Sequence, residues 1–186
     1  MKKGVHAVYE TVFLKGVPKI FGSLAEYDLW RTAIANAAKI RMPEVMLFGS
    51  AHVGYSLAPL KFGRPFSRIA TIDRRASDLD LSIINERLFL AAWNSVVEQD
   101  RKQTLGINRD DTNRLHQNIY YGFLSDKLVP RGSNSFRTIV EIRNCTGLHV
   151  VSSGIKVNIR LYRRNEDLFG YQIWSLRNLK YELLNL

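Results

Sequence analysis

The sequence predicts an α/β (α+β) domain in which a small mixed β-sheet is flanked by helices. Three patterns lead to this fold class. A helical stretch runs into a short apolar segment, 45–48, which ends at a glycine. Two later segments, 77–84 and 155–163, alternate polar and apolar side chains, as strands with one dry face do. Helical periodicity between and after these segments supplies the flanking layers.

Size and charge narrow the classes of protein that the chain can belong to. Its 186 residues, 46% of them hydrophobic, suit a single domain, 1–186, around one core. The net charge of +10 favours anionic partners such as nucleotides, nucleic acids or acidic surfaces. Cys145 is the single cysteine, so we expect no internal disulfide and a reducing, cytoplasmic location. No segment approaches the ~20 apolar residues that span a bilayer, so we expect no membrane partner.

The first part of the chain predicts a helix followed by a buried strand. Residues 1–22 hold several glycines and a short apolar cluster that suits either a strand or a helical turn. Ser23 is suited to cap a helix, and apolar residues at helical spacing continue through 24–40. The apolar run 45–48 then predicts a buried strand that leads into a turn at Gly49.

A basic loop and a charged strand come next. The Pro, Gly and Arg content of about 57–76 predicts an inserted surface loop with at most one helical turn. The segment 77–84 alternates strictly, so it predicts a strand with one charged and one dry face. Its charged face carries Asp78, Asp80 and Ser82, and its dry face carries Leu79, Leu81 and Ile83.

The residues between the charged strand and the last strand predict mostly helix. We expect a helical insertion at about 86–127, made of one helix over 86–104 and a second over 110–127. Residues 128–133 spell LVPRGS, a thrombin recognition sequence, which we interpret as native sequence, and they predict an exposed, cleavable loop. The following segment, 135–145, suits either helix or strand.

The end of the chain predicts two strands and a helix. The strands are expected at 148–152 and 155–163, with their connection near Ser153 and Gly154. In the second strand Lys156, Asn158 and Arg160 share the polar face. The closing helix is expected from about 168 or 171 to 184.

Four small or acidic residues form a pattern that suits phosphate and metal binding. Gly49 allows a tight turn, and Ser50 with the following backbone amides can hold a phosphate at the start of a helix. Asp78 and Asp80 project from the same face of a strand, about 7 Å apart along the backbone. Two such carboxylates can bind Mg2+ (or Mn2+), and the metal can bridge to the phosphates of a nucleotide.

The segments FGSAHVGYS and SDLDLSII together resemble the signature of the DNA polymerase beta superfamily of nucleotidyltransferases, a Gly-Ser turn followed by a strand with two metal-binding aspartates. GIKVNIRLYRR resembles the strand that carries the third carboxylate of that family, and GYQIWSLRNLKYEL resembles the segment after it. The resemblance covers about 24–56, 77–84 and 148–184. It implies the nucleotidyltransferase fold, metal-binding Asp78 and Asp80, a third catalytic position at Asn158, and Trp174 beside the nucleotide sugar.

Two features depart from the family pattern. The Gly-Ser turn lies further from the first aspartate than in compact members, which the inserted loop accounts for. Asn158 stands where the third carboxylate is expected, and an amide can ligate weakly through its oxygen but cannot act as a base. Glu141 is a candidate substitute from a neighbouring element.

Other basic and aromatic residues are weaker candidates for nucleotide contacts. Lys156 and Arg160 share a face with Asn158, and His52 follows the Gly-Ser turn, near the expected triphosphate, although a surface role is the alternative. Several arginines could bind phosphates of a nucleotide or a nucleic acid, or simply form a solvated face: Arg64, Arg68, Arg74, Arg75, Arg163 and Arg164. Three aromatic residues suit helix packing better than base stacking: Tyr120, Tyr121 and Phe123.

These features predict a metal-dependent nucleotidyltransferase that moves a nucleoside monophosphate from a nucleoside triphosphate to a hydroxyl and releases pyrophosphate. The acceptor stays open between a nucleic acid, a nucleotide, a small molecule and a protein. The alternative is a catalytically impaired module of the same fold that binds nucleotide or nucleic acid and regulates a protein partner. A third hypothesis is a partner-binding or assembly protein in which the Asp-x-Asp segment is an ordinary surface strand.

Overall fold

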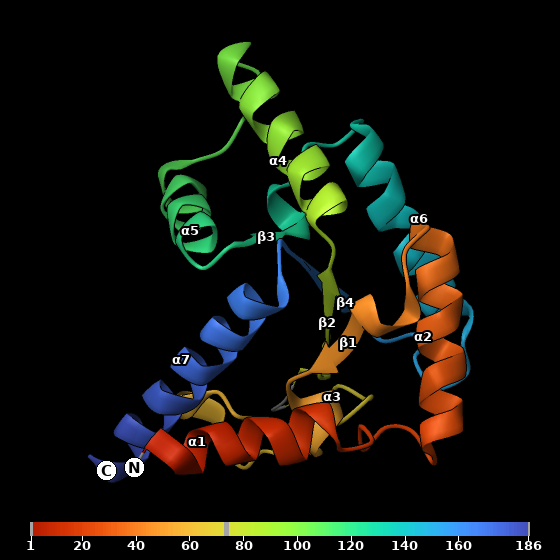
Figure 1. Cartoon of the computed structure of the whole chain (residues 1–186), viewed down its shortest axis with the longest axis vertical. Helices are drawn as coiled ribbons and strands as arrows, with labels where there is room; N and C mark the ends of the chain where they lie inside the picture. The colour runs from red at the N-terminus through yellow and green to blue at the C-terminus, as the bar shows by residue number, and fades with distance from the viewer. Residues whose placement is uncertain (1, 73–74, 186) are drawn as a thin grey trace.

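The computed structural model describes residues 2–72 and 75–185, and it has the α+β architecture expected from the sequence (Figure 1). Within the described residues, a four-stranded sheet has the order β1-β2-β4-β3. The strands are β1 (Val45–Phe48), β2 (Leu79–Ile84), β3 (Phe123–Ser125) and β4 (Val157–Tyr162). The α-helices are α1 (Lys2–Val8), α2 (Leu24–Ala38), α3 (Ser50–Val53), α4 (Glu86–Arg101), α5 (Arg109–Tyr120), α6 (Asn134–Leu148) and α7 (Asn165–Leu184).

The sheet is mixed, and its register sets one polar row across it. β1 runs antiparallel to β2, β2 runs parallel to β4, and β3 runs antiparallel to β4. Asp80 of β2 therefore pairs with Asn158 of β4, and Ser82 pairs with Arg160. Because side chains alternate along a strand, these four residues point to the same face of the sheet.

The opposite face is dry and forms the larger hydrophobic core. It carries Leu81, Leu124 and Ile159, which pack with apolar residues of α2, α4 and α6. Figure 1 shows α2 and α6 side by side along this face. A buried hydrogen bond from Trp30 Nε1 to Ser152 Oγ, 3.0 Å long, ties α2 to the turn that follows α6.

A second, smaller core covers only one end of the polar face. The N-terminal helix continues from α1 into a π-helical segment, Tyr9–Leu14, and packs with α7 over aromatic residues of the sheet (Figure 1). The buried members of this core are Tyr9, Phe13, Phe48, Ile84, Phe123, Tyr162, Leu168 and Ile173. Asp80 and Asn158 are not covered by this smaller core, and they line a cavity described below.

Most of the predicted elements are confirmed. α2 begins after Ser23, whose Oγ accepts a hydrogen bond from the Glu26 backbone N–H at 3.1 Å. The strands expected at 45–48, 77–84 and 155–163 are β1, β2 and β4. Within 57–76 the described residues form loop with one 3₁₀ turn, Pro59–Lys61. The two ambiguous segments, 1–22 and 135–145, are mainly helical in their described parts.

Two predicted elements are wrong. The helix expected over 110–127 ends at Tyr120, because Gly122 adopts a φ of 70° and the chain then pairs with β4 as strand β3. No strand forms over 148–152. The backbone N–H groups of Ser152 and Ser153 both bond to the His149 carbonyl, at 3.0 and 2.8 Å, so these residues turn locally instead of joining a ladder.

The LVPRGS segment is also less open than predicted. Leu128 and Val129 are buried in the larger core, and Pro130 is buried as well. Arg131 and Gly132 are exposed. In the described residues, no helix is both long and apolar enough to cross a membrane.

Candidate functional site

Gly49 and Asp80 meet at the end of β1, as the sequence pattern requires. Gly49 has a φ of 68° and connects β1 to the single-turn helix α3, which Ser50 begins. A β-carbon at position 49 would collide with the carboxylate of Asp80. Glycine is therefore needed here for two reasons, the left-handed φ and the close approach of the carboxylate.

Ser50, Asp78, Asp80 and Asn158 line one cavity of about 400 Å³, which we call the acidic cavity. These residues come from α3, from the start of β2 and from β4. The inserted loop forms the remaining wall and contributes Lys61, Arg64 and Arg75 to it. The insertion that separates the Gly-Ser turn from the first aspartate in sequence thus folds back over the same cavity and adds positive charge.

Each carboxylate in the acidic cavity lies near one basic side chain, from β4 or from the residue just before it. Lys156 Nζ is 3.6 Å from Asp78 Oδ2, and Arg160 Nη1 is 3.9 Å from Asp80 Oδ1. The Asn158 amide donates a hydrogen bond to Asp78 Oδ2 at 3.1 Å. Burial raises the pKa of the Asp80 carboxyl, and the neighbouring Asp78 adds to this shift, whereas Arg160 and Asn158 oppose it.

The oxygen atoms of this cluster fit a hard divalent cation. Asn158 Oδ1 is buried and has no hydrogen-bond partner in the described part of the chain. With the carboxylates of Asp78 and Asp80 it makes a set of oxygen donors of the type that Mg2+ takes. No group of three or more His, Cys, Asp and Glu side chains arranged for a metal occurs among residues 2–72 and 75–185, and this cluster consists of two carboxylates and one amide.

Glu141 does not replace the missing third carboxylate. It lies on the exposed side of α6, and the buried side of that helix packs against the dry face of the sheet through Ile139 and Ile142. The acidic cavity opens on the other face. Glu141 therefore does not stand in for a carboxylate at Asn158, the position to which the resemblance assigns the third ligand.

His52 does not line the acidic cavity and packs against aromatic residues of the smaller core. Its side chain is 3% exposed, and its ring nitrogens lie 2.8 Å from the carbonyl oxygens of Val12 and Leu47. Burial lowers the pKa of this imidazole, and the two carbonyls only partly oppose the shift. The geometry gives His52 a structural role: it joins α3 to the N-terminal π-helical segment.

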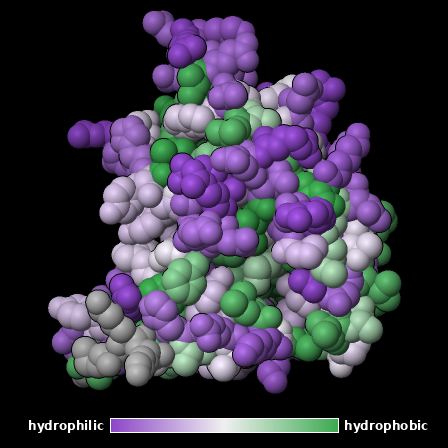
Figure 2. Space-filling view, viewed as in Figure 1, coloured by the Kyte–Doolittle hydropathy of each residue, from purple (hydrophilic) through white to green (hydrophobic). Residues whose placement is uncertain are grey.

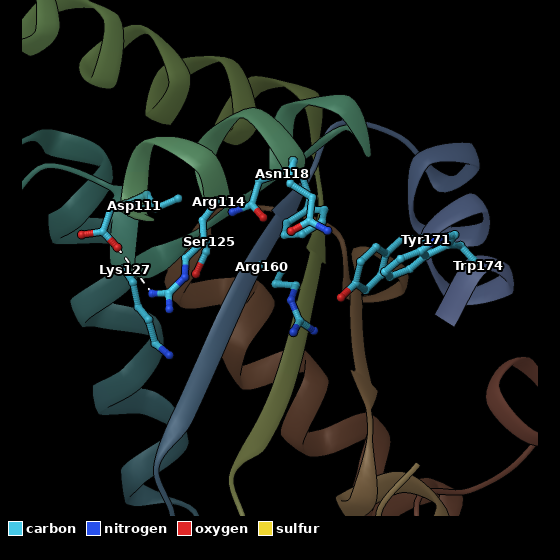
Figure 3. Close-up of a pocket in the computed structure, with 11 residues that line it drawn as sticks. Asp111, Arg114, Asn118, Ser125, Lys127, Arg160, Tyr171 and Trp174 are labelled. Carbon is cyan, nitrogen blue, oxygen red and sulfur yellow. Dashed lines mark hydrogen bonds and ion pairs between the residues drawn. The ribbon is translucent and has the colours of Figure 1, made fainter. Parts of the chain in front are cut away.

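Trp174 and Arg160 lie in a second cavity of about 520 Å³, which we call the aromatic cavity. Arg160 of β4 lines this cavity and pairs with Asp80, which lines the acidic cavity. Figure 3 shows Arg160 between Tyr171 and Trp174 of α7 on one side and residues of α5 and β3 on the other. Sequence reasoning missed the contribution of α5, because nothing in its local pattern says which strand it covers.

The remaining basic residues divide between the cavities and the solvent. Of the arginines of the insertion, Arg64 and Arg75 line the acidic cavity, Arg68 is exposed, and Arg74 lies outside the described residues. Arg163 bonds to Asp167 through two hydrogen bonds of 3.0 and 3.1 Å, so it is committed to α7. Figure 2 shows hydrophilic residues gathered across the middle of the viewed face, over the region of the strands.

Comparisons with protein-family models, with curated proteins and with solved structures find no match to this chain. The chemistry of the two cavities therefore carries the functional argument.

Proposed function

We propose that the chain is a metal-dependent nucleotidyltransferase, which moves a nucleoside monophosphate from a nucleoside triphosphate to a hydroxyl acceptor and releases pyrophosphate. One observation carries the proposal. Ser50, the Asp78–Asp80 pair and Asn158, which are far apart in sequence, line one cavity together with basic residues of the insertion. This is the arrangement that the resemblance to the DNA polymerase beta superfamily implies.

In this proposal one set of residues in the acidic cavity binds the metal and another set binds the phosphates. Asp78, Asp80 and Asn158 Oδ1 would hold Mg2+ or Mn2+, which when bound neutralises phosphate charge and polarises the reacting phosphoryl group. Lys61, Arg64 and Arg75 would bind the polyphosphate and stabilise the departing pyrophosphate. The Ser50 hydroxyl would orient a phosphate next to Gly49, where no side chain obstructs the approach.

Asn158 sets the expected level of activity. Its amide can position a ligand but cannot accept the proton of the attacking hydroxyl. We therefore expect slow turnover in the natural chain and a faster reaction after Asn158→Asp, which restores a carboxylate at the position paired with Asp80.

The test is pyrophosphate release with Mg2+ and with Mn2+, for each of the four common nucleoside triphosphates, with and without an oligonucleotide acceptor. Release should disappear in Asp78→Asn and persist in Glu182→Gln, an exposed carboxylate of α7 that serves as the matched control. No release under any condition, including after Asn158→Asp, would remove the enzymatic claim.

A second candidate function is a nucleotide- or nucleic-acid-binding module that has lost catalysis. The observations that favour it are the amide at position 158 and the basic partner of each carboxylate, Lys156 for Asp78 and Arg160 for Asp80. It predicts metal-dependent triphosphate binding without turnover, both before and after Asn158→Asp. Calorimetry on the same variants separates it from the enzyme.

A further inference from the structure

The aromatic cavity has the features of a binding site. Two of its residues have been discussed already: Trp174, which the family resemblance places beside the nucleotide sugar, and Arg160, which pairs with Asp80 of the acidic cavity. It is about 520 Å³ in volume and lies between α5, α7 and the edge strand β3. The volume falls within the range of cavities that hold small ligands in proteins.

One side of the cavity is formed by aromatic rings that contact one another. The rings of Tyr171 and Trp174 are tilted by 33° with centroids 5.8 Å apart, and the Tyr121 ring lies 5.0 Å from the Trp174 ring. Tyr171 and Trp174 are both partly exposed, so the cavity still reaches their rings. The Arg160 guanidinium lies over the Tyr171 ring at 5.5 Å. A flat ring system could stack against this wall.

Asn118, which comes from α5, is one of three uncharged polar residues among the described residues that line the cavity; the others are Gln117 and Ser125. Asn118 is 8% exposed, lines the cavity, and its side-chain amide forms no hydrogen bond within the part of the chain that the structure describes. Among the described residues, its amide atoms are not in the set of fully buried side-chain atoms without a partner, so they are accessible from the cavity. An unpaired amide that borders a cavity points to a ligand with a donor and an acceptor side by side.

The charge around the cavity adds a third requirement. Arg114, Lys127 and Arg160 line it, and Asp111, the one acidic residue in the described part of its lining, is paired with Arg114 at 3.4 Å (Figure 3). The ligand should therefore carry negative charge next to its flat ring. A nucleotide combines a flat ring, an edge with adjacent donor and acceptor atoms, and a phosphate.

We propose that the aromatic cavity binds the base of a nucleotide, with the ring stacked on Trp174 and Tyr171 and its edge hydrogen-bonded to the Asn118 amide. The inference rests on the proposed function, which names nucleotides as substrates, and it adds Asn118 as the residue that reads the base. The base belongs either to the donor triphosphate or to the end of an acceptor strand, and both sources present the same chemistry.

The test uses calorimetry on the full chain with three probes: the four nucleoside triphosphates, the four nucleoside monophosphates, and inorganic tripolyphosphate. The variants are Asn118→Leu, which removes the amide at similar volume, and Trp174→Ala, which removes a stacking face. Asn113→Leu is the matched control, because Asn113 lies exposed on the same helix and outside the cavity. Thermal unfolding of each variant identifies any that fails to fold.

We expect Asn118→Leu and Trp174→Ala each to weaken nucleotide binding by roughly tenfold and Asn113→Leu to leave it unchanged. Tripolyphosphate binding should be the same in all folded variants, because that probe has no base. Asn118→Leu should also flatten any preference among the four bases. Equal nucleotide affinity in the natural chain and in both cavity variants would overturn the inference.

The outcomes also separate this inference from the proposed function. Nucleotide binding that depends on Asn118, without pyrophosphate release under any condition, supports the base site and removes the enzyme. Pyrophosphate release that is unchanged by Asn118→Leu and Trp174→Ala supports the enzyme and removes the base site. Where both hold, a raised KM for the triphosphate assigns the base to the donor, and weaker binding of a labelled oligonucleotide assigns it to the acceptor.

Discussion

The two faces of the sheet are built from the same strands, yet they differ in almost every physical property. On β2, Leu81 is fully buried in the larger core, whereas its neighbour Asp80 faces a cavity and a basic side chain. On β4, Ile159 and Asn158 differ in the same way. Strand alternation alone produces the contrast, because successive side chains point to opposite faces.

The difference separates what holds the fold together from what the chain can bind. The dry face is covered by α2, α4 and α6, so its residues contribute through burial of apolar surface. The polar face is closed at one end only, by α1, the π-helical segment and α7. Its open part keeps two carboxylates, one amide and several cations within reach of a ligand. Substitutions on the two faces should therefore fail in different assays.

The largest expected effect is on the dry face. Leu81→Ala should lower the free energy of unfolding by about 2 to 5 kcal/mol, because it leaves a void in a fully buried position. Urea unfolding measures it. Leu60→Ala is the control, since Leu60 is 94% exposed and its loss should change stability by no more than about 0.5 kcal/mol. Equal effects of the two substitutions would show that the two faces are not distinguished by burial.

Asp80→Asn, one residue away from Leu81, should abolish activity without lowering the free energy of unfolding at neutral pH. Burial raises the pKa of Asp80 above its ordinary value of 3.8, so the folded chain binds this proton more tightly than the unfolded chain. The stabilisation from Asp80 is thus present at low pH and lost as pH rises through the folded pKa. At neutral pH, Asp80→Asn should be at least as stable as the natural chain while losing pyrophosphate release.

Unfolding of both proteins at several pH values between about 4 and 7 checks this prediction. The stability advantage of the variant should grow with pH across that range. A variant that is less stable than the natural chain at neutral pH would mean that the pair with Arg160 outweighs the burial of the carboxylate.

The polar face was predictable from sequence where its residues follow local rules. Alternation in 77–84 and 155–163 assigns Asp80 and Asn158 to one face, and Gly49 marks the turn that meets them. These assignments need no knowledge of the rest of the chain. The register between β2 and β4 then places Asp80 beside Asn158.

The aromatic cavity and strand β3 were not predictable in this way, because they depend on contacts between distant segments. Phe123 and Leu124 continue the helical spacing of α5, and only the free edge of β4 makes them a strand. Asn118 looks like any polar residue of an amphipathic helix until α5 covers the sheet. The pairing of His52 with the Val12 carbonyl, forty positions earlier, has no local signal either.

The buried imidazole of His52 should make the stability of the folded chain depend on pH. Burial lowers its pKa from the ordinary value of 6.5, so the unfolded chain takes up this proton first as pH falls. Stability should therefore be full above about pH 6.5 and decline as the pH is lowered toward the folded pKa. His52→Gln should flatten this decline, and His116→Gln, at an exposed position, should not. Denaturant titrations at a series of pH values measure the slopes. Matching slopes in the two variants would assign the pH dependence to other groups.

The smallest expected effect concerns the LVPRGS segment, residues 128–133. Leu128 lines the aromatic cavity and is also part of the larger core, and Val129 follows it into that core. A protease must bind the residues that precede its cleavage site in an extended conformation. In this chain those residues include Leu128 and Val129, which are buried. Thrombin should therefore leave the folded chain intact although Arg131 and Gly132 are exposed. Leu128→Ala, which loosens the packing, should allow slow cleavage that gel electrophoresis can follow. Rapid cleavage of the natural chain would show that this segment opens freely, and that the dry face is less well closed than its burial suggests.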